Sequence, residues 1–210
     1  MSEAYIVDAV RTPRGIGKVG KGSLADIHPQ QLGATVLSAL RERNDIKTDT
    51  VDDIIWGTSS QRGKQGADIG RMSALDAGFD IKASGVTLDR FCGSGITTVN
   101  FAAASIMSGM EDVVIAGGTE MMSYTSATAD PTSPMMMDSG NLRLRARHPQ
   151  SHQGVCADAI ATMEGITRLA TEELAVESQK RADNAIKNGY FEKSLVPVYK
   201  EDGALALDRE

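Results

Sequence analysis

The chain has 210 residues, of which 41% are hydrophobic and 24% charged, and this composition is typical of a folded globular protein and excludes global disorder. The formal net charge of -6 argues against a nucleic-acid partner, because a nucleic-acid surface normally carries a clustered basic excess. The length suits one substantial domain, or one domain and part of a second.

Two cysteines, Cys92 and Cys156, are too few for a disulfide framework. The first ten residues contain Glu3 and Asp8 and lack the apolar core of a secretory signal, so we expect a cytoplasmic setting. Residues 91–110 carry no charge, but their serines, threonines and glycines make them too polar for a bilayer. We therefore expect a helix buried in protein and no membrane partner.

The first two-thirds of the chain alternates strand and helix patterns. Residues Tyr5–Val10 predict a strand, and Pro29 marks the first turn of a helix that continues to Arg43. A second strand is expected at Ile54–Gly57 and a shorter helix at Gln65–Ala77. A polar loop separates the first strand from the first helix.

The same alternation continues to Glu120. Residues Gly85–Leu88 predict a buried strand, Gly93–Ser108 a long helix, and Val113–Ala116 another strand. Strand and helix in repeated succession with short joints predict an α/β fold with a mostly parallel sheet.

The pattern changes after Glu120, which suggests domains at 1–120 and 121–210. Residues 121–147 show no steady hydrophobic periodicity of either a helix or a strand. We therefore interpret them as a segment that leaves the sheet domain. Helical signal returns at about 155–169, and Thr171 is expected to cap a further helix that ends at Asn188–Gly189. A last strand is expected at Leu195–Tyr199.

Cys92 is the strongest candidate for chemistry. It follows a predicted strand and precedes a long helix, where free backbone N–H groups and the helix dipole favour a thiolate and could bind an oxyanion. The alternative is a small packed cysteine on a tight turn. A P-loop is excluded because no Gly-Lys-Ser/Thr follows the glycines, and the three histidines show no zinc-ligand spacing, so no metal is expected.

Three strings occur in the order Tyr5-Ile6-Val7-Asp8-Ala9-Val10-Arg11-Thr12-Pro13, Leu88-Asp89-Arg90-Phe91-Cys92-Gly93-Ser94-Gly95 and Ala116-Gly117-Gly118-Thr119-Glu120-Met121-Met122-Ser123. Taken together, in this order and spacing, they resemble the thiolase family. The related ketoacyl synthases share the fold and a cysteine at a helix start, but the sequence around Cys92 is more similar to thiolases. The resemblance extends over essentially the whole chain. It implies a layered α/β fold, of which this chain is the amino-terminal βαβαβαβ half with part of an inserted loop domain.

The resemblance also implies an activity and a site. Cys92 matches the family cysteine that takes an acyl group from acyl-CoA, so coenzyme A thioesters are the expected substrates and no cofactor is expected. His152 matches a position near the pantetheine arm of CoA, with an ordinary surface or capping histidine as the alternative. Gln153 beside it departs from the methionine of many biosynthetic enzymes, which leaves the acyl-chain preference open. The family is oligomeric, so we expect a homo-oligomer.

Thiolases contain two similar halves, and the family's activating histidine, water-positioning asparagine and second cysteine belong to the later one. None can be assigned to this chain. Two functions therefore follow: an acetyl-CoA acetyltransferase or 3-ketoacyl-CoA thiolase of fatty acid metabolism that needs a carboxy-terminal half as partner, or a non-catalytic half-thiolase that binds CoA or docks onto another subunit.

Three further features have structural explanations that compete with a functional one. Cys156 lies at the start of a predicted helix but has no counterpart role in the family. Arg143, Arg145 and Arg147 could meet CoA phosphates or form a solvated loop. The methionines at 121–122 and 135–137 could line an acyl channel or fill gaps in a core.

Overall fold

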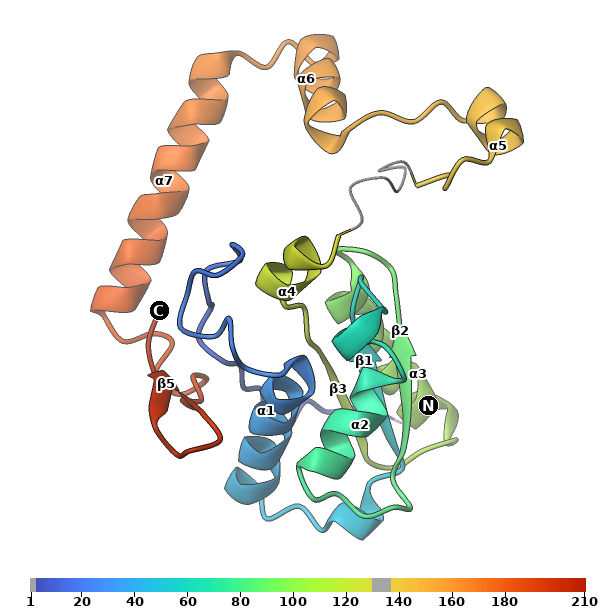
Figure 1. Ribbon diagram of the computed structural model, residues 1–210, viewed down its shortest axis with the longest axis vertical. Coiled ribbons are helices and arrows are strands. Elements are labelled where there is room, and N and C mark those ends of the chain that lie inside the picture. Colours follow the sequence, from blue (N-terminus) through green and yellow to red (C-terminus); the bar gives the residue numbers. More distant parts are fainter. Residues whose placement is uncertain (1–2, 130–136) are drawn as a thin grey trace. The chain divides into compact units, whose positions relative to one another are not determined.

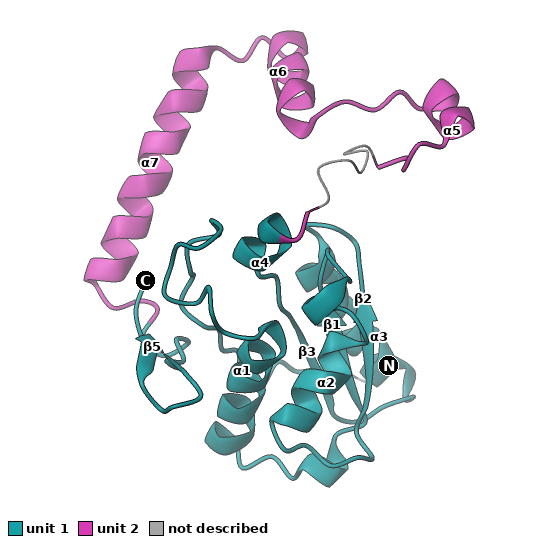
Figure 2. Ribbon diagram, viewed as in Figure 1, with its two compact units in different colours: residues 1–127, 192–210 teal, residues 128–191 magenta. Residues whose placement is uncertain are grey.

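The computed structural model describes residues 3–129 and 137–210, which form two compact units (Figures 1 and 2). The first unit contains the residues up to 127 together with 192–210, and the second contains 128–191. The sequence placed a domain boundary at 120/121. In the structure the first unit extends to residue 127, and residues 192–210 also belong to it.

The first unit is built on a three-stranded parallel sheet of order β2-β1-β3. Its strands are β1 (Asp53–Gly57), β2 (Ser84–Leu88) and β3 (Val114–Gly118). The predicted mixed α/β class and parallel sheet are confirmed. The expectation that β2 is buried was wrong: it is an edge strand, and none of its residues is fully buried.

Three helices cover the two faces of this sheet (Figure 1). They are α1 (Pro29–Arg43), α2 (Ile69–Asp76) and α3 (Ser94–Ser108). Ile54 and Trp56 of β1 pack into a core with α1 and α2. Gly57 points to the opposite face, since successive strand residues alternate, and a Cβ there would lie 2.9 Å from Cβ of Ser94 in α3. Helices α1 and α2 therefore lie on one face and α3 on the other.

The start of α1 follows the sequence prediction. Pro29 occupies the first turn, and Nδ1 of His28 accepts a hydrogen bond from Gln30 N at 3.2 Å. Helix α2 begins later than predicted, because a short 3-10 helix (Gly63–Gln65) and a left-handed Asp68 precede it. The side chain of Asp68 caps the shortened helix.

Helix α3 is covered on one side within the first unit. Its buried residues are small or polar: Ser94, Thr97, Thr98 and Ala102. Its large apolar residues are exposed, among them Ile96, Val99, Phe101 and Met107. The sequence predicted a helix covered on more than one side, and the first unit by itself does not provide that second cover.

The predicted strand Tyr5–Val10 is not formed. Tyr5, Ile6 and Val7 are 75–84% exposed, and the nearby strand pairing is a single bridge between Arg11 and Leu195. A short run of aromatic and β-branched residues predicts an extended backbone, but a strand also needs a partner. A cavity of about 190 Å³ lies here, lined by residues 10–12, one side of α1 and residues 116–120.

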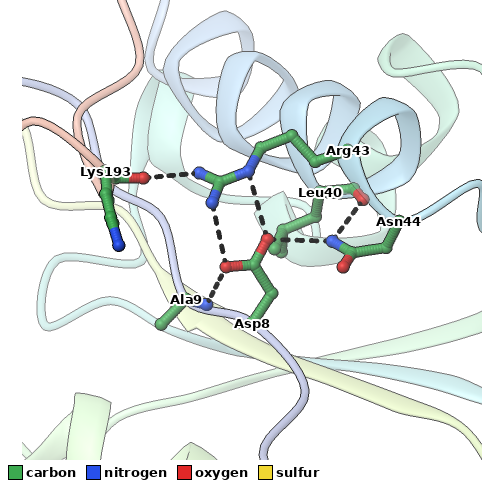
Figure 3. Close-up of polar contacts among 6 residues, drawn as sticks. All are labelled: Asp8, Ala9, Leu40, Arg43, Asn44 and Lys193. Atoms are coloured by element: carbon green, nitrogen blue, oxygen red, sulfur yellow. Dashed lines mark hydrogen bonds and ion pairs between the residues drawn. The ribbon is translucent and has the colours of Figure 1, made fainter.

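Asp8 joins this extended segment to the end of α1 (Figure 3). Its carboxylate accepts hydrogen bonds from Asn44 Nδ2 at 2.9 Å and from Ala9 N at 2.8 Å, and it forms an ion pair with Arg43 at 3.2 Å. Arg43 also donates to the carbonyl oxygen of Lys193 at 2.8 Å, which ties the returning chain to the same place. The hydrogen bonds from the Asn44 amide and the Ala9 N–H, with a smaller contribution from the Arg43 charge, hold the pKa of Asp8 below its usual value against the opposing effect of burial.

Asp8→Asn should therefore destabilise the first unit at neutral pH and make little difference in acid. A lowered pKa contributes stability above the unfolded-state value of about 3.9, and this contribution is lost as pH falls through the folded-state value. The test compares thermal midpoints of variant and parent at pH 7 and near pH 3. Asp208→Asn, at an exposed aspartate of the same unit, is the control. A difference for Asp8→Asn that stays constant across this range would contradict the assignment.

The remaining elements correct several boundaries. Residues 121–147, expected to be irregular, contain α4 (Met122–Ala127) in the first unit and α5 (Leu142–Arg147) in the second. Helix α6 (Gln153–Met163) is followed by Gly165 in the left-handed region, and Thr167 rather than Thr171 caps α7 (Arg168–Lys187). Within the returning chain, β4 (Val198–Tyr199) pairs with β5 (Leu205–Leu207), so the expected strand at 195–199 is shorter than predicted.

Candidate active site

The carboxyl ends of the three parallel strands lie at one edge of the sheet, which is where open α/β sheets place their ligands. Two backbone hydrogen bonds draw the segments after the strands together. Thr58 N donates to Leu88 O at 3.1 Å, and Thr119 N donates to Gly57 O at 3.0 Å. The turn that carries Cys92 follows β2 at this edge.

The turn from Asp89 to Gly93 is tight and strained. Gly93 N donates to Arg90 O at 3.0 Å, and Phe91 N donates to a carboxylate oxygen of Asp89 at 2.7 Å. Phe91 has φ +49°, a left-handed conformation that costs a non-glycine residue about 1–2 kcal/mol. Cys92 comes next and is exposed, so its thiol is accessible to a substrate.

The helix start offers fewer free donors than the sequence suggested. The N–H groups of Gly93 and Ser94 are used inside the turn, by Arg90 O and Phe91 O at 3.0 and 3.1 Å. The N–H of Cys92 makes no hydrogen bond within residues 3–129 and 137–210. Of these three N–H groups, that of Cys92 is the one able to bind an oxyanion.

A buried polar network fixes the neighbouring strand ends. The side chain of Gln65 is fully buried, and its Nε2 donates to Thr58 Oγ1 and to Glu120 Oε1, each at 3.1 Å. Its Oε1 accepts from Met121 N at 2.7 Å, and Glu120 also accepts from Ser59 N at 2.7 Å. Gln65 was not among the site residues predicted from the sequence. The available signal was a polar residue beside apolar helical positions, which is too common to be selective.

His152 and Gln153 belong to the second unit, whereas Cys92 belongs to the first, so each is described within its own unit. His152 caps α6: its Nδ1 accepts a hydrogen bond from Gly154 N at 3.2 Å, and its side chain is exposed. Gln153 is the first residue of α6 and is exposed. This is the capping arrangement that the sequence left open, and a capping imidazole keeps its other ring nitrogen for a ligand.

The basic run in α5 is not uniformly free. Arg145 forms two hydrogen bonds with the carboxylate of Asp138, at 2.5 and 2.7 Å, and the Asp138 side chain is fully buried. Arg145 is the main cause that lowers the pKa of Asp138. This pair joins Asp138 to α5 and occupies Arg145, so Arg143 and Arg147 remain the candidates for an anion. Met137 is exposed; the rest of the predicted methionine group at 135–137 lies outside the described residues.

Within 3–129 and 137–210, no group of three or more His, Cys, Asp or Glu side chains is arranged to hold a metal ion. Over the same residues, no helix combines the length and apolar character that a membrane span needs.

Comparison with known proteins decides the family. The family described as "Thiolase, N-terminal domain" matches residues 4–208. The chain belongs to the thiolase family. The predicted resemblance is thereby confirmed, and the match is to the amino-terminal domain of thiolases.

Individual relatives support the same assignment. Steroid 3-ketoacyl-CoA thiolase FadA6 of Mycobacterium tuberculosis is 38% identical over 99% of this chain and 52% of that protein. Beta-ketothiolase BktB of Cupriavidus necator is 37% identical, over 93% of this chain and 51% of that protein. Beta-ketoadipyl-CoA thiolase of Acinetobacter baylyi is 36% identical, over 94% of this chain and 52% of that protein. The chain therefore spans about half the length of the curated relatives that it matches.

Proposed function

We propose that this chain supplies the nucleophile of a thiolase-type acyltransferase, with Cys92 as the residue that is acylated. The observation that carries the proposal is the position of Cys92, exposed in a strained turn between a parallel strand and α3. The substrate class is inferred from family membership and from relatives whose names include 3-ketoacyl-CoA thiolase.

The first half-reaction is an exchange of thioesters. The Cys92 thiolate attacks the carbonyl carbon of acyl-CoA, and the oxyanion of the tetrahedral intermediate accepts a hydrogen bond from the N–H of Cys92. The intermediate collapses with cleavage of the bond to the CoA sulfur. CoA leaves as a thiolate, takes up a proton and leaves an acyl-Cys92 thioester behind.

In the second half-reaction, the carbanion of another acetyl-CoA attacks the acyl-Cys92 carbonyl. A carbon–carbon bond forms, the Cys92 thiolate is released, and the product is a 3-ketoacyl-CoA. The reverse sequence is thiolysis, in which CoA cleaves a 3-ketoacyl-CoA at the same site. The base that forms the carbanion is expected from the later half of the fold. His152 and Gln153 are proposed to contact the pantetheine arm of CoA.

A non-catalytic half-thiolase is the second candidate, and the exposed apolar residues of α3 favour it. Such a surface suits docking onto a carboxy-terminal half or onto another subunit. The two candidates differ in one property, because an acyltransferase must accept an acyl group on Cys92 and a docking module need not.

Acetyl-CoA should acetylate Cys92 well before Cys156. Both cysteines are exposed, but Cys92 lies in the turn before a helix whereas Cys156 lies inside α6. The measurement is mass mapping of cysteine peptides after timed incubation at neutral pH. Cys156→Ala should leave acetylation unchanged and Cys92→Ala should remove it. Equal or faster acetylation of Cys156 would refute the role of Cys92.

A further inference from the structure

The hydroxyl group of Ser94 is bound to the turn that precedes Cys92. Ser94 Oγ accepts a hydrogen bond from Arg90 N at 2.9 Å and donates one to Phe91 O at 2.7 Å. The residue is 6% exposed, so these bonds are shielded from water. Nothing in the chemistry of Cys92 as described above uses this side chain.

Other hydroxyl groups on the same helix behave differently. Thr97 Oγ1 donates to Gly93 O at 2.9 Å, and Thr98 Oγ1 donates to Gly95 O at 2.8 Å. Both are common bonds, from a helical threonine to a carbonyl three or four residues earlier, and among the described residues neither hydroxyl group also accepts a backbone hydrogen bond. Ser94 differs in that its Oγ also accepts a hydrogen bond, from Arg90 N, so it joins the peptide group before Arg90 to the peptide group that follows the strained Phe91.

Fixing the carbonyl group of Phe91 has a direct effect on Cys92. Phe91 C=O and Cys92 N–H belong to the same peptide group, which is planar and trans, so the two bonds point in opposite directions. The N–H and the hydroxyl of Ser94 both bind Phe91 O, at 3.1 and 2.7 Å. The Cys92 N–H is thereby turned away from the start of α3 and left without a partner among the described residues.

There is little room for Ser94 to move. A Cβ on Gly57 would lie 2.9 Å from Cβ of Ser94 and 3.2 Å from its carbonyl carbon, so the end of β1 presses directly on the start of α3. This contact limits movement of the Ser94 backbone and Cβ, and the two hydrogen bonds place the hydroxyl group at the turn. The strain at Phe91 is therefore kept by hydrogen bonds on one side and by close packing on the other.

We propose that Ser94 is a positioning residue for acyl transfer, which orients the Cys92 N–H toward the oxyanion by holding the Phe91 carbonyl in place. The proposal rests on the proposed function of Cys92. Replacing Ser94 should therefore slow reactions of Cys92 that pass through an oxyanion and should not slow reactions that do not.

Two reactions of the same thiol separate these cases. p-Nitrophenyl acetate acylates a cysteine through a tetrahedral oxyanion and needs no CoA recognition. Iodoacetamide alkylates the thiolate by direct displacement, without an oxyanion. For Ser94→Ala, acylation of Cys92 should fall about tenfold or more relative to alkylation, within the ~10²–10³-fold cost of removing an oxyanion donor outright.

Matched variants complete the test. Ser94→Thr keeps the hydroxyl group and should retain the ratio of acylation to alkylation, and Thr98→Ala, which removes a buried hydroxyl one turn later, should leave both rates unchanged. Circular dichroism confirms that each variant is folded. If Ser94→Ala does not fold, Ser94→Gly, which also removes the hydroxyl group and needs no additional space, decides, and an unchanged ratio would overturn the proposal.

The outcomes are distinct. A parallel fall of both rates in Ser94→Ala would show a merely structural role and overturn the proposal, and so would an unchanged ratio. Failure of acetyl-CoA to acylate the parent chain, together with normal acylation by p-nitrophenyl acetate, would count against the proposed function. The Ser94 variants could still be compared with the parent by means of p-nitrophenyl acetate and iodoacetamide.

Discussion

Leu37→Ala should destabilise the first unit by about 2–5 kcal/mol, the range for removing a buried leucine side chain from a packed core. Leu37 is fully buried on α1, where it belongs to the cluster formed by both helices on that face and by β1. Part of this loss is the favourable free energy of transferring the removed apolar atoms from water to the core. The rest is the cost of the cavity that they leave behind. The measurement is urea denaturation followed by the fluorescence of the single tryptophan, Trp56, which lies in the same cluster.

Leu75→Ala is the matched control. It makes the same substitution on the neighbouring helix α2, at a side chain that is 39% exposed. We expect a loss below about 1 kcal/mol, because much of this side chain is already in water. Equal losses at the two positions would mean that the cluster around Leu37 is not the core of the unit.

The elements that the sequence predicted best are those whose signals are local. Pro29 with a polar residue before it determines where α1 begins, and Gly109 in the left-handed region determines where α3 ends. Apolar runs bounded by turn residues gave β1 and β3 to within a residue or two. Capping and hydrogen bonding within a helix depend on near neighbours, so a single sequence contains the necessary information.

The errors concern partners that are distant in the sequence. Tyr5–Val10 has a strand pattern, yet its pairing depends on a neighbour that the pattern cannot name. Strand β2 reads as buried from its composition, but its place at the edge follows from the order of the sheet. The boundary between α6 and α7 was misplaced because Thr167 and Thr171 are equally good caps in sequence, and Gly165 decides between them by ending α6.

In the candidate site, too, the features that could be predicted were local in the sequence, and those that could not were details of the folded backbone and its contacts. The position of Cys92 before a helix followed from the strand, turn and helix pattern. The backbone strain at Phe91, the use of two helix-start N–H groups inside the turn and the contacts of Gln65 depend on the three-dimensional structure and could not be predicted from the sequence. A serine at the start of a helix is ordinary in sequence, and its hydrogen bonds distinguish Ser94.

A polypeptide of these 210 residues alone should cleave acetoacetyl-CoA at a rate close to background, even though Cys92 is present. Thiolysis needs a base that activates the nucleophile and a group that protonates the departing acetyl-CoA carbanion. The first unit contains one histidine, His28, and its Nδ1 caps α1. General acid–base groups contribute about 10²–10⁴-fold each, so the absence of two would remove most of the rate.

Mixing with a separately expressed carboxy-terminal thiolase half should restore part of the activity. The large exposed side chains of α3, including Ile96 and Phe101, are the surface on which such a half would bury its own apolar residues. Light scattering of the chain alone tests the related expectation that it self-associates through this surface. Restored turnover should depend on Cys92 and be insensitive to Cys156, which Cys92→Ala and Cys156→Ala test as a matched pair.

The experiment also separates the two candidate functions. A docking module would bind the added half and give no turnover that depends on Cys92, whereas a thiolase half would give turnover that is lost with Cys92→Ala. Robust Cys92-dependent thiolysis by the 210-residue polypeptide without a partner would contradict both, because the acid–base groups would then have to lie within this chain. His148 and His152 of the second unit would be the first residues to replace in that case, since thiolysis requires a proton donor and acceptor near neutral pH.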